Sequence, residues 1–114
     1  ILCGVSAGSI CWYDKGITDS WASNLSILDC LGFINGNNCP HYDGEKDRRP
    51  FVHNFIKTKK IDSCYASDDG AAIHFINGKI YKSISFYKNA KSYLITMDLN
   101  DKVVEEEISK TSLI

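Results

Sequence analysis

The pentapeptide Gly4-Val5-Ser6-Ala7-Gly8 constrains this chain more than any other stretch of its sequence. The apolar run Ile1–Cys3 precedes it and the segment Ser9–Tyr13 follows, so the pattern predicts a strand, a tight turn and a helix. In a G-x-S-x-G nucleophile elbow, small residues flank a serine whose strained backbone exposes the hydroxyl, and the amides that open the helix lie where an oxyanion would form. Ser6 is therefore a candidate nucleophile. By itself the motif is weak, because a glycine-containing turn can produce it by chance.

The composition limits which class of protein the chain can be and which partners it can bind. A chain of 114 residues is long enough for one modest domain, and 44% apolar with 24% charged residues is typical of a soluble globular protein. The net charge of -1 argues against binding to nucleic acid or to an anionic membrane surface, because both need a basic excess. The sequence has no run of eighteen apolar residues, so no membrane span is expected.

The cysteines give no framework for a disulfide-rich or zinc-binding domain. They lie at positions 3, 11, 30, 39 and 64, an odd set without C-x-x-C spacing. Reduced thiols in the cytoplasm fit this set best, and no metal or other cofactor is expected.

The first residues predict that more chain belongs to this domain. Ile1–Cys3 reads as a buried strand, yet no initiator methionine, polar leader or capping residue precedes it. A buried parallel strand needs neighbours on both sides. We therefore expect residues 1–114 to be a single unit, the C-terminal fragment of a longer domain whose missing N-terminal portion supplies strands.

The rest of the chain alternates strand, turn and helix signals. The expected order is a stop at residues 14–16, a loop over 17–24 around Trp21, one or two strands over 25–34, a turn at 35–38 and a polar loop at 39–45. Asp47–Lys60 predicts a helix, with Asp47 as N-cap, Pro50 in the first turn and an apolar face of Phe51, Val52, Phe55 and Ile56. A strand over 61–67 is expected next, followed by two hairpins, 71–76 with 79–86 across Asn77-Gly78 and 93–99 with 102–108 across Asn100-Asp101. Glu105–Glu107 is read as a solvated edge.

A serine nucleophile needs a base and usually a carboxylate behind that base. His41 is the best candidate base because it lies in the polar loop after a strand, whereas His53 and His74 fall within a helix and a strand and are read as structural. The Asp68-Asp69-Gly70 turn ends another strand and is the candidate source of the acid. The resulting order, Ser then His then acid, differs from the α/β-hydrolase order.

Three motifs in this order resemble the peptidase E family. They are Gly4-Val5-Ser6-Ala7-Gly8, Asn38-Cys39-Pro40-His41-Tyr42 and Asp69-Gly70. The family consists of aspartyl dipeptidases related to cyanophycinases, and the resemblance implies an α/β fold like that of the class I glutamine amidotransferases, with a mainly parallel sheet. It also implies that Ser6 is the nucleophile, His41 the general base and Asp69 the acid, where the family commonly has Glu. Asp68 is the alternative acid.

The resemblance further implies a substrate and its contacts. Family members cleave dipeptides with an N-terminal aspartate, and an arginine downstream of the histidine is implicated in holding the substrate carboxylate. Arg48 and Arg49 lie in the matching region, and a forked guanidinium suits a carboxylate. Surface arginines at a helix start are the competing interpretation. The amide of Ala7 would supply one oxyanion donor, while the second would come from a loop outside this chain, so little activity is expected of the chain alone.

Two other functions stay open on the sequence. One is a cyanophycinase-like or amidotransferase-like hydrolase that acts on another amide with the same elbow. The other is a non-catalytic binding domain that keeps the fold without the chemistry. The oligomeric state and the natural peptide are not fixed by the sequence.

Overall fold

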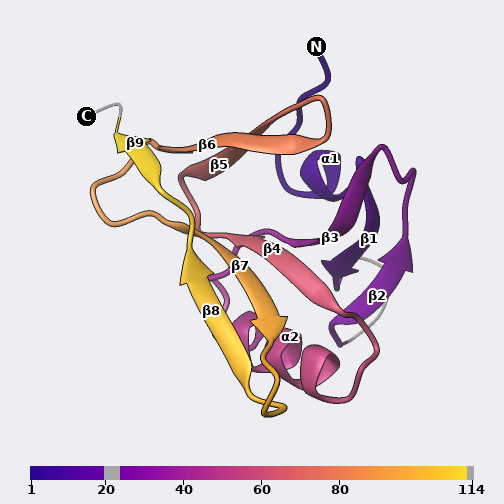
Figure 1. Cartoon of the computed structure of the whole chain (residues 1–114). Coiled ribbons are helices and arrows are strands. Elements are labelled where there is room, and N and C mark those ends of the chain that lie inside the picture. Colours follow the sequence, from indigo (N-terminus) through magenta and orange to yellow (C-terminus); the bar gives the residue numbers. More distant parts are fainter. Residues whose placement is uncertain (20–23, 113–114) are drawn as a thin grey trace.

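The computed structural model describes residues 1–19 and 24–112, so the predicted loop residue Trp21 lies outside the described part. The helices found there are α1 (Ala7–Ile10) and α2 (Arg48–Lys57). The strands are β1 (Tyr13–Thr18), β2 (Ser26–Asp29), β3 (Ile34–Cys39), β4 (Ser63–Ser67), β5 (Ala71–Ile76), β6 (Lys79–Ser85), β7 (Ser92–Met97), β8 (Val103–Glu107) and β9 (Lys110–Ser112). Within these residues they form a six-stranded sheet, β2-β1-β3-β4-β7-β8, and a three-stranded sheet, β5-β6-β9 (Figure 1).

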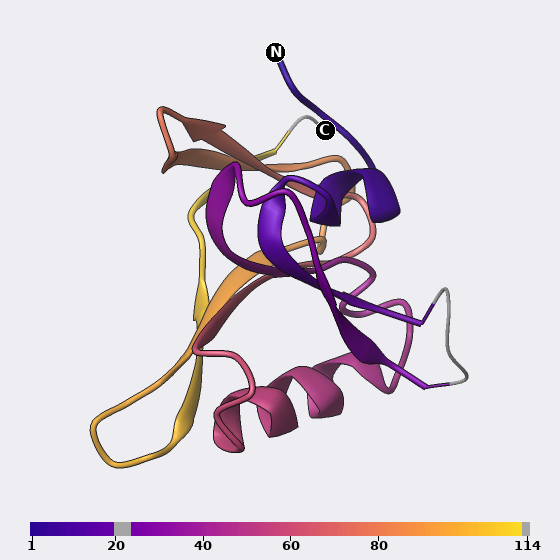
Figure 2. The ribbon, with the colours of Figure 1, turned by 90° about the vertical axis from the view of Figure 1, so that its right-hand side faces the viewer.

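The six-stranded sheet lies between α2 and the smaller sheet. Figure 2 shows α2 along one face and the β5–β6 hairpin beyond the other. Val52 and Ile56 of α2 pack with Ile17, Cys64 and Ile95 of the sheet to form the main core. On the opposite face, the rings of Tyr13, Tyr65 and Phe75 contact one another and join the two sheets. The predicted α/β class is confirmed, as is the helix with its apolar face.

The centre of the large sheet is parallel and its margins are antiparallel. β3 runs parallel to both β1 and β4, whereas β2, β7 and β8 each pair antiparallel with a neighbour. Cys39 pairs with Ala66, so β3 and β4 end side by side. The residues directly after these two strands therefore meet at one edge of the sheet, where parallel sheets usually bind ligands.

The prediction of a stop at residues 14–16 is wrong, because β1 runs through this stretch and continues over Ile17 and Thr18, the first two residues of the predicted loop. Lys15 pairs with Asp29 across the sheet at 2.7 Å, and Asp14 accepts a hydrogen bond from the amide of Gly36 at 2.9 Å. Gly16 leaves room for α1, since a Cβ there would lie 2.6 Å from Ile10 Cβ. The glycine marks a close approach between two elements rather than a turn.

The turn predicted at residues 35–38 is also wrong, because this stretch lies within β3. The buried Asn37 and Asn38 side chains donate hydrogen bonds to the carbonyls of Ser63 and Tyr65 on β4, at 2.8 and 2.9 Å. Gly36 has φ 113°, a backbone region that favours glycine. The cross-strand contacts satisfy amides that would otherwise favour a turn.

The strand predicted for Ile1–Cys3 is absent from the described residues. Ile1 and Leu2 are exposed, and none of residues 1–4 joins either sheet. The helix predicted after the elbow is a single turn of four residues, because β1 begins at Tyr13. A helix this short gives little dipole.

Both predicted hairpins are confirmed. β5 and β6 meet across Asn77-Gly78, whose φ angles of 53° and 79° fit a tight primed turn. β7 and β8 pair from Tyr93–Glu107 to Met97–Val103. No helix of the described residues has the length and apolar character needed to cross a membrane.

Candidate active site

Ser6 lies at a strained corner between the N-terminal residues and α1. Its φ of 57° and ψ of -119° are rarely adopted by a residue with a side chain. Such a conformation costs about 1–3 kcal/mol and persists where the surroundings impose it, often at functional sites. The strained turn that the motif predicts is therefore present.

The two glycines of the elbow are not equivalent. A Cβ on Gly4 would lie 2.0 Å from the carbonyl oxygen of Gly8, so only glycine fits there. A Cβ on Gly8 would meet nothing within 4 Å among the described residues. The elbow therefore depends sterically on Gly4.

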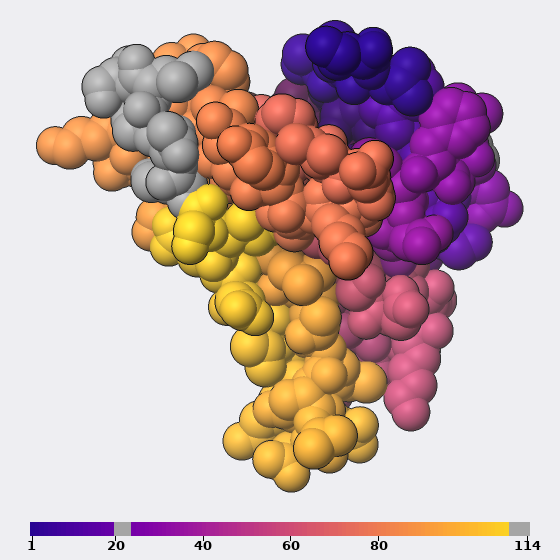
Figure 3. All heavy atoms as spheres, turned by 45° about the horizontal axis from the view of Figure 1, so that its top comes forward, coloured from indigo at the N-terminus to yellow at the C-terminus, as the bar shows by residue number. Residues whose placement is uncertain are grey.

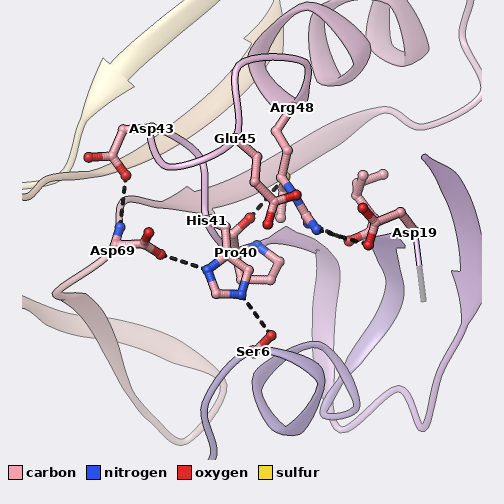
Figure 4. Close-up of polar contacts among 10 residues, drawn as sticks. Ser6, Asp19, Pro40, His41, Asp43, Glu45, Arg48 and Asp69 are labelled. Atoms are coloured by element: carbon pink, nitrogen blue, oxygen red, sulfur yellow. Dashed lines mark hydrogen bonds and ion pairs between the residues drawn. The ribbon is translucent and has the colours of Figure 1, made fainter. Parts of the chain in front are cut away.

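His41 lies between Ser6 and Asp69 (Figure 4). Ser6 Oγ is 2.8 Å from His41 Nε2, and His41 Nδ1 is 2.6 Å from Asp69 Oδ1. A carboxylate accepts hydrogen bonds, so Nδ1 carries the proton and Nε2 of the neutral ring accepts the hydrogen bond from the serine hydroxyl. This is the tautomer that a base for serine requires.

Asp69 is held from the loop that follows His41. Its amide donates a hydrogen bond to Asp43 Oδ1 at 2.8 Å (Figure 4). A Cβ on Gly44 would lie 2.2 Å from Asp69 Oδ2, so the glycine lets the loop pass close to this carboxylate. The loop after β3 and the turn after β4 therefore fix each other.

The carboxylate of Asp68 is bound to another part of the chain. Asp68 is 7% exposed, and its Oδ2 accepts a hydrogen bond from the amide of Lys91 at 3.0 Å. Burial raises the pKa of Asp68, and the charge of Asp43 raises it further against the opposing effect of the Lys91 amide. Among the two candidate acids, the structure therefore brings only Asp69 into contact with His41.

Both candidate substrate arginines lie outside this group. Arg48 is 4% exposed and is held by Glu45 at 2.9 Å, the carbonyl of Ile17 at 3.1 Å and Asp19 at 3.6 Å (Figure 4). Arg49 binds Glu105 at 3.0 Å instead. A role for either in substrate binding stays a prediction.

A pocket of about 270 Å³ opens beside Ser6 and His41. It lies between the elbow and the start of β5, and its walls include Gly4, Ser6, His41, Asp69, Ala72 and Phe86. Figure 3 shows the N-terminal residues and the β5–β6 hairpin next to each other on this face. The volume is near the lower end of small-ligand sites, about 300–1,000 Å³.

The polar groups around Ser6 suit acyl transfer. No described backbone carbonyl accepts a hydrogen bond from the amide of Ala7, which leaves this donor available beside Ser6. No group of three or more His, Cys, Asp or Glu side chains among residues 1–19 and 24–112 could hold a metal ion. Ser6, His41 and Asp69 therefore meet at one pocket, in the arrangement that nucleophile, base and orienting carboxylate would need for this chemistry.

The sequence analysis missed the residues that support this group. Asp43 and Gly44 lie two and three residues after His41 in the loop Pro40–Glu45, whose polar, glycine-containing sequence was the available signal. The contact between Glu105 and Tyr42 joins residues 63 positions apart, and no local pattern indicates it.

This chain is similar in sequence to a known protein family and to a curated relative. The family model described as peptidase family S51 matches residues 1–83, a range that includes Ser6, His41 and Asp69. The uncharacterized peptidase YgaJ of Bacillus subtilis (strain 168) is 48% identical over 113 residues, which cover 99% of this chain and 46% of YgaJ. The chain thus spans about half the length of this relative. These matches confirm the resemblance to the peptidase E family. Because the family model covers most of the chain, the chain belongs to peptidase family S51.

Proposed function

We propose that the protein is a serine peptidase in which Ser6 is the nucleophile, His41 the general base and Asp69 the acid that orients His41. The observation that carries the proposal is the continuous chain of contacts, 2.8 Å from Ser6 Oγ to His41 Nε2 and 2.6 Å from His41 Nδ1 to Asp69 Oδ1. The chain of contacts borders a pocket of about 270 Å³. Membership in a peptidase family supports the same reaction.

The proposed reaction proceeds through an acyl-enzyme. Ser6 Oγ attacks the peptide carbonyl carbon while His41 Nε2 takes the hydroxyl proton, and the amide of Ala7 donates to the oxyanion. His41 then gives the proton to the leaving amine as the C–N bond breaks. Water repeats the sequence on the ester, which releases the acid and restores Ser6.

The proposed substrates are short peptides, and in particular dipeptides with N-terminal aspartate. The small pocket supports a short ligand, whereas the preference for aspartate rests on the resemblance to peptidase E alone. Arg48 and Arg49 each bind carboxylates of the chain itself. A cytoplasmic site of action is part of the same proposal. It agrees with the free thiols of Cys3, Cys11, Cys30, Cys39 and Cys64, since thiols stay reduced in the cytoplasm.

Substrate profiling tests this proposal on the natural polypeptide that carries residues 1–114. Asp-Leu and Asn-Leu are nearly equal in size and differ in charge, so faster hydrolysis of Asp-Leu would support the aspartate preference. Cleavage of β-aspartyl-arginine in place of both would favour a cyanophycinase-like hydrolase. If no amide is cleaved and Ser6 never reacts with a phosphonate, the protein is a binding domain and the proposal is wrong.

A further inference from the structure

Glu105 of β8 accepts three hydrogen bonds on one carboxylate oxygen. Tyr42 Oη donates through a short hydrogen bond, Arg49 Nε lies at 3.0 Å and His53 Nε2 at 2.8 Å from Oε1. The three donors come from the loop after β3 and from α2. Glu105 therefore joins β8 to the segment that carries His41 and to the helix that follows it.

The neighbours of Glu105 in the sequence show that this arrangement is specific. Glu106 is exposed, and Glu107 is exposed and forms a 3.6 Å ion pair with Lys91. The side chain of Glu105 is only 23% exposed. The interpretation of the three glutamates as one solvated edge is therefore wrong for Glu105, because Arg49 and His53 of α2 bind its carboxylate.

Tyr42 is fixed at both of its ends. Its side chain is 1% exposed and packs against Tyr93, with ring centroids 5.7 Å apart, while the Arg49 guanidinium lies 4.6 Å from the Tyr42 ring centroid. Its amide donates to the carbonyl of Ser67 at 3.0 Å, directly before the Asp68-Asp69 turn. The position of Tyr42 thus sets the distance between the two segments that hold His41 and Asp69.

His41 needs such an anchor because its backbone is strained. Its φ is 56°, a left-handed conformation that disfavours residues with a side chain. Strained residues at functional sites persist only where surrounding contacts over-determine them. The hydroxyl of Tyr42, one residue away, is tied to β8 through Glu105.

We propose that Glu105 is a positioning residue, which acts through Tyr42 to hold His41 in hydrogen-bond reach of both Ser6 and Asp69. Glu105 touches neither the pocket nor the reacting atoms; it fixes the loop that presents the base. This inference rests on the proposed function for its effect on catalysis. The proposed effect of Glu105 on the position of His41 does not depend on the proposed function, because the position of His41 can be measured directly.

The charge of Glu105 suits this role. Burial raises the pKa of Glu105, but the hydrogen bonds from Tyr42 and His53 and the charge of Arg49 outweigh burial and leave the pKa below its usual value. Glu105 is therefore ionised at neutral pH and accepts charge-assisted hydrogen bonds.

Kinetics of four variants test the proposal. A displacement near 1 Å can cost about a hundredfold in rate. We therefore expect Glu105→Ala and Tyr42→Phe each to lower kcat by up to about a hundredfold and by at least about tenfold, and to change KM less than twofold. Glu105→Gln keeps an acceptor oxygen and should recover part of the loss. The exposed neighbour provides the control, and Glu106→Ala should leave kcat unchanged.

A variant that combines Tyr42→Phe with Glu105→Ala distinguishes a positioning role of Glu105 from a general stabilising role. If Glu105 acts through Tyr42, Tyr42→Phe combined with Glu105→Ala should lower kcat no more than the larger single change. Additive losses, or a kcat for Glu105→Ala within twofold of wild type at a temperature where it is folded, would overturn the proposal.

Proton NMR gives a readout that does not need activity. The Nδ1 proton of His41 donates to Asp69 over 2.6 Å, so it should give a far-downfield, slowly exchanging signal that Asp69→Asn removes. We expect Glu105→Ala and Tyr42→Phe to weaken this signal and Glu106→Ala to preserve it. An unchanged signal in the first two variants contradicts positioning, even if Ser6 proves unreactive, whereas a weakened signal without hydrolysis contradicts only the proposed function.

Discussion

Gly4→Ala should disable the elbow while the chain stays folded. The new Cβ would lie 2.0 Å from the Gly8 carbonyl oxygen and 2.4 Å from its carbon. Carbon and oxygen atoms normally approach no closer than about 3.3 Å, so Gly4 and Gly8 must separate by about 1.3 Å. The Gly8 carbonyl is backbone and the position of the new Cβ is fixed by the backbone of residue 4, so no side-chain rotation can relieve the contact.

The displacement falls on Ser6 because it lies between the two glycines. Ser6 Oγ is 2.8 Å from His41 Nε2, and an added separation near 1 Å breaks this hydrogen bond. A misplacement of about 1 Å can cost about a hundredfold in rate. We therefore expect Gly4→Ala to lower kcat, and the rate at which a phosphonate ester modifies the serine, by about a hundredfold.

Gly8→Ala is the matched control for this prediction. It adds the same methyl group to the same elbow, but its Cβ meets nothing within 4 Å in the described residues. Phosphonate modification is measured for both variants, with thermal unfolding followed by circular dichroism to show that each is folded. Equal rates for folded Gly4→Ala and Gly8→Ala would refute the claim that Gly4 holds Ser6 in place.

Three further predictions concern the carboxylates and the core. Asp69→Asn should lower kcat by about 10²–10⁴-fold and Asp68→Asn by much less, because only Asp69 contacts His41; a larger loss with Asp68→Asn in steady-state kinetics would reverse the assignment. The raised pKa of Asp68 means that its contribution to stability is present below its unfolded pKa of about 3.9 and is lost as pH rises through the folded pKa. Asp68→Asn should therefore resist urea better than wild type at pH 7, with a difference that vanishes near pH 3; equal midpoints at pH 7 would contradict this. Ile95 is 0% exposed, and Ile95→Ala should lower the free energy of unfolding in urea by about 2–5 kcal/mol. Val104 is 40% exposed, and Val104→Ala should lower it much less. Similar losses in the two variants would contradict the assignment of Ile95 to the core.

The features that the sequence predicted depend on contacts between near neighbours. Helix α2 follows from the spacing of its apolar residues, and the β5–β6 hairpin follows from Asn77-Gly78. The motif that contains Ser6 also predicts the strained turn, because the steric need for glycine lies within five residues.

The features that the sequence did not predict depend on distant partners. Residues 35–38 look like a turn until β4 supplies carbonyls for the side chains of Asn37 and Asn38. Lys15 and Gly16 look like a stop until Asp29 and Ile10 lie beside them. Tertiary contacts override local propensity in each case.

The candidate active site also contains both residues that the sequence could place and residues that it could not. His41 and the Asp68-Asp69 turn could be selected from their places after two strands, because adjacent parallel strands end at one edge of a sheet. The position in the sequence left the choice between Asp68 and Asp69 open, and the contact with His41 distinguishes them. The place of Arg49 could not, since its partner Glu105 lies 56 residues away and looks like part of a solvated acidic run. A charged residue near a catalytic motif does not reveal whether it faces substrate or the protein itself.

Mapping a serine-directed phosphonate by mass spectrometry tests the central claim most directly. In the natural polypeptide that carries residues 1–114, we predict modification at Ser6, at a rate that His41→Gln lowers by about 10²–10⁴-fold. Modification of another residue, or an equal rate in folded His41→Gln, would contradict the assignment of Ser6 and His41 as nucleophile and base.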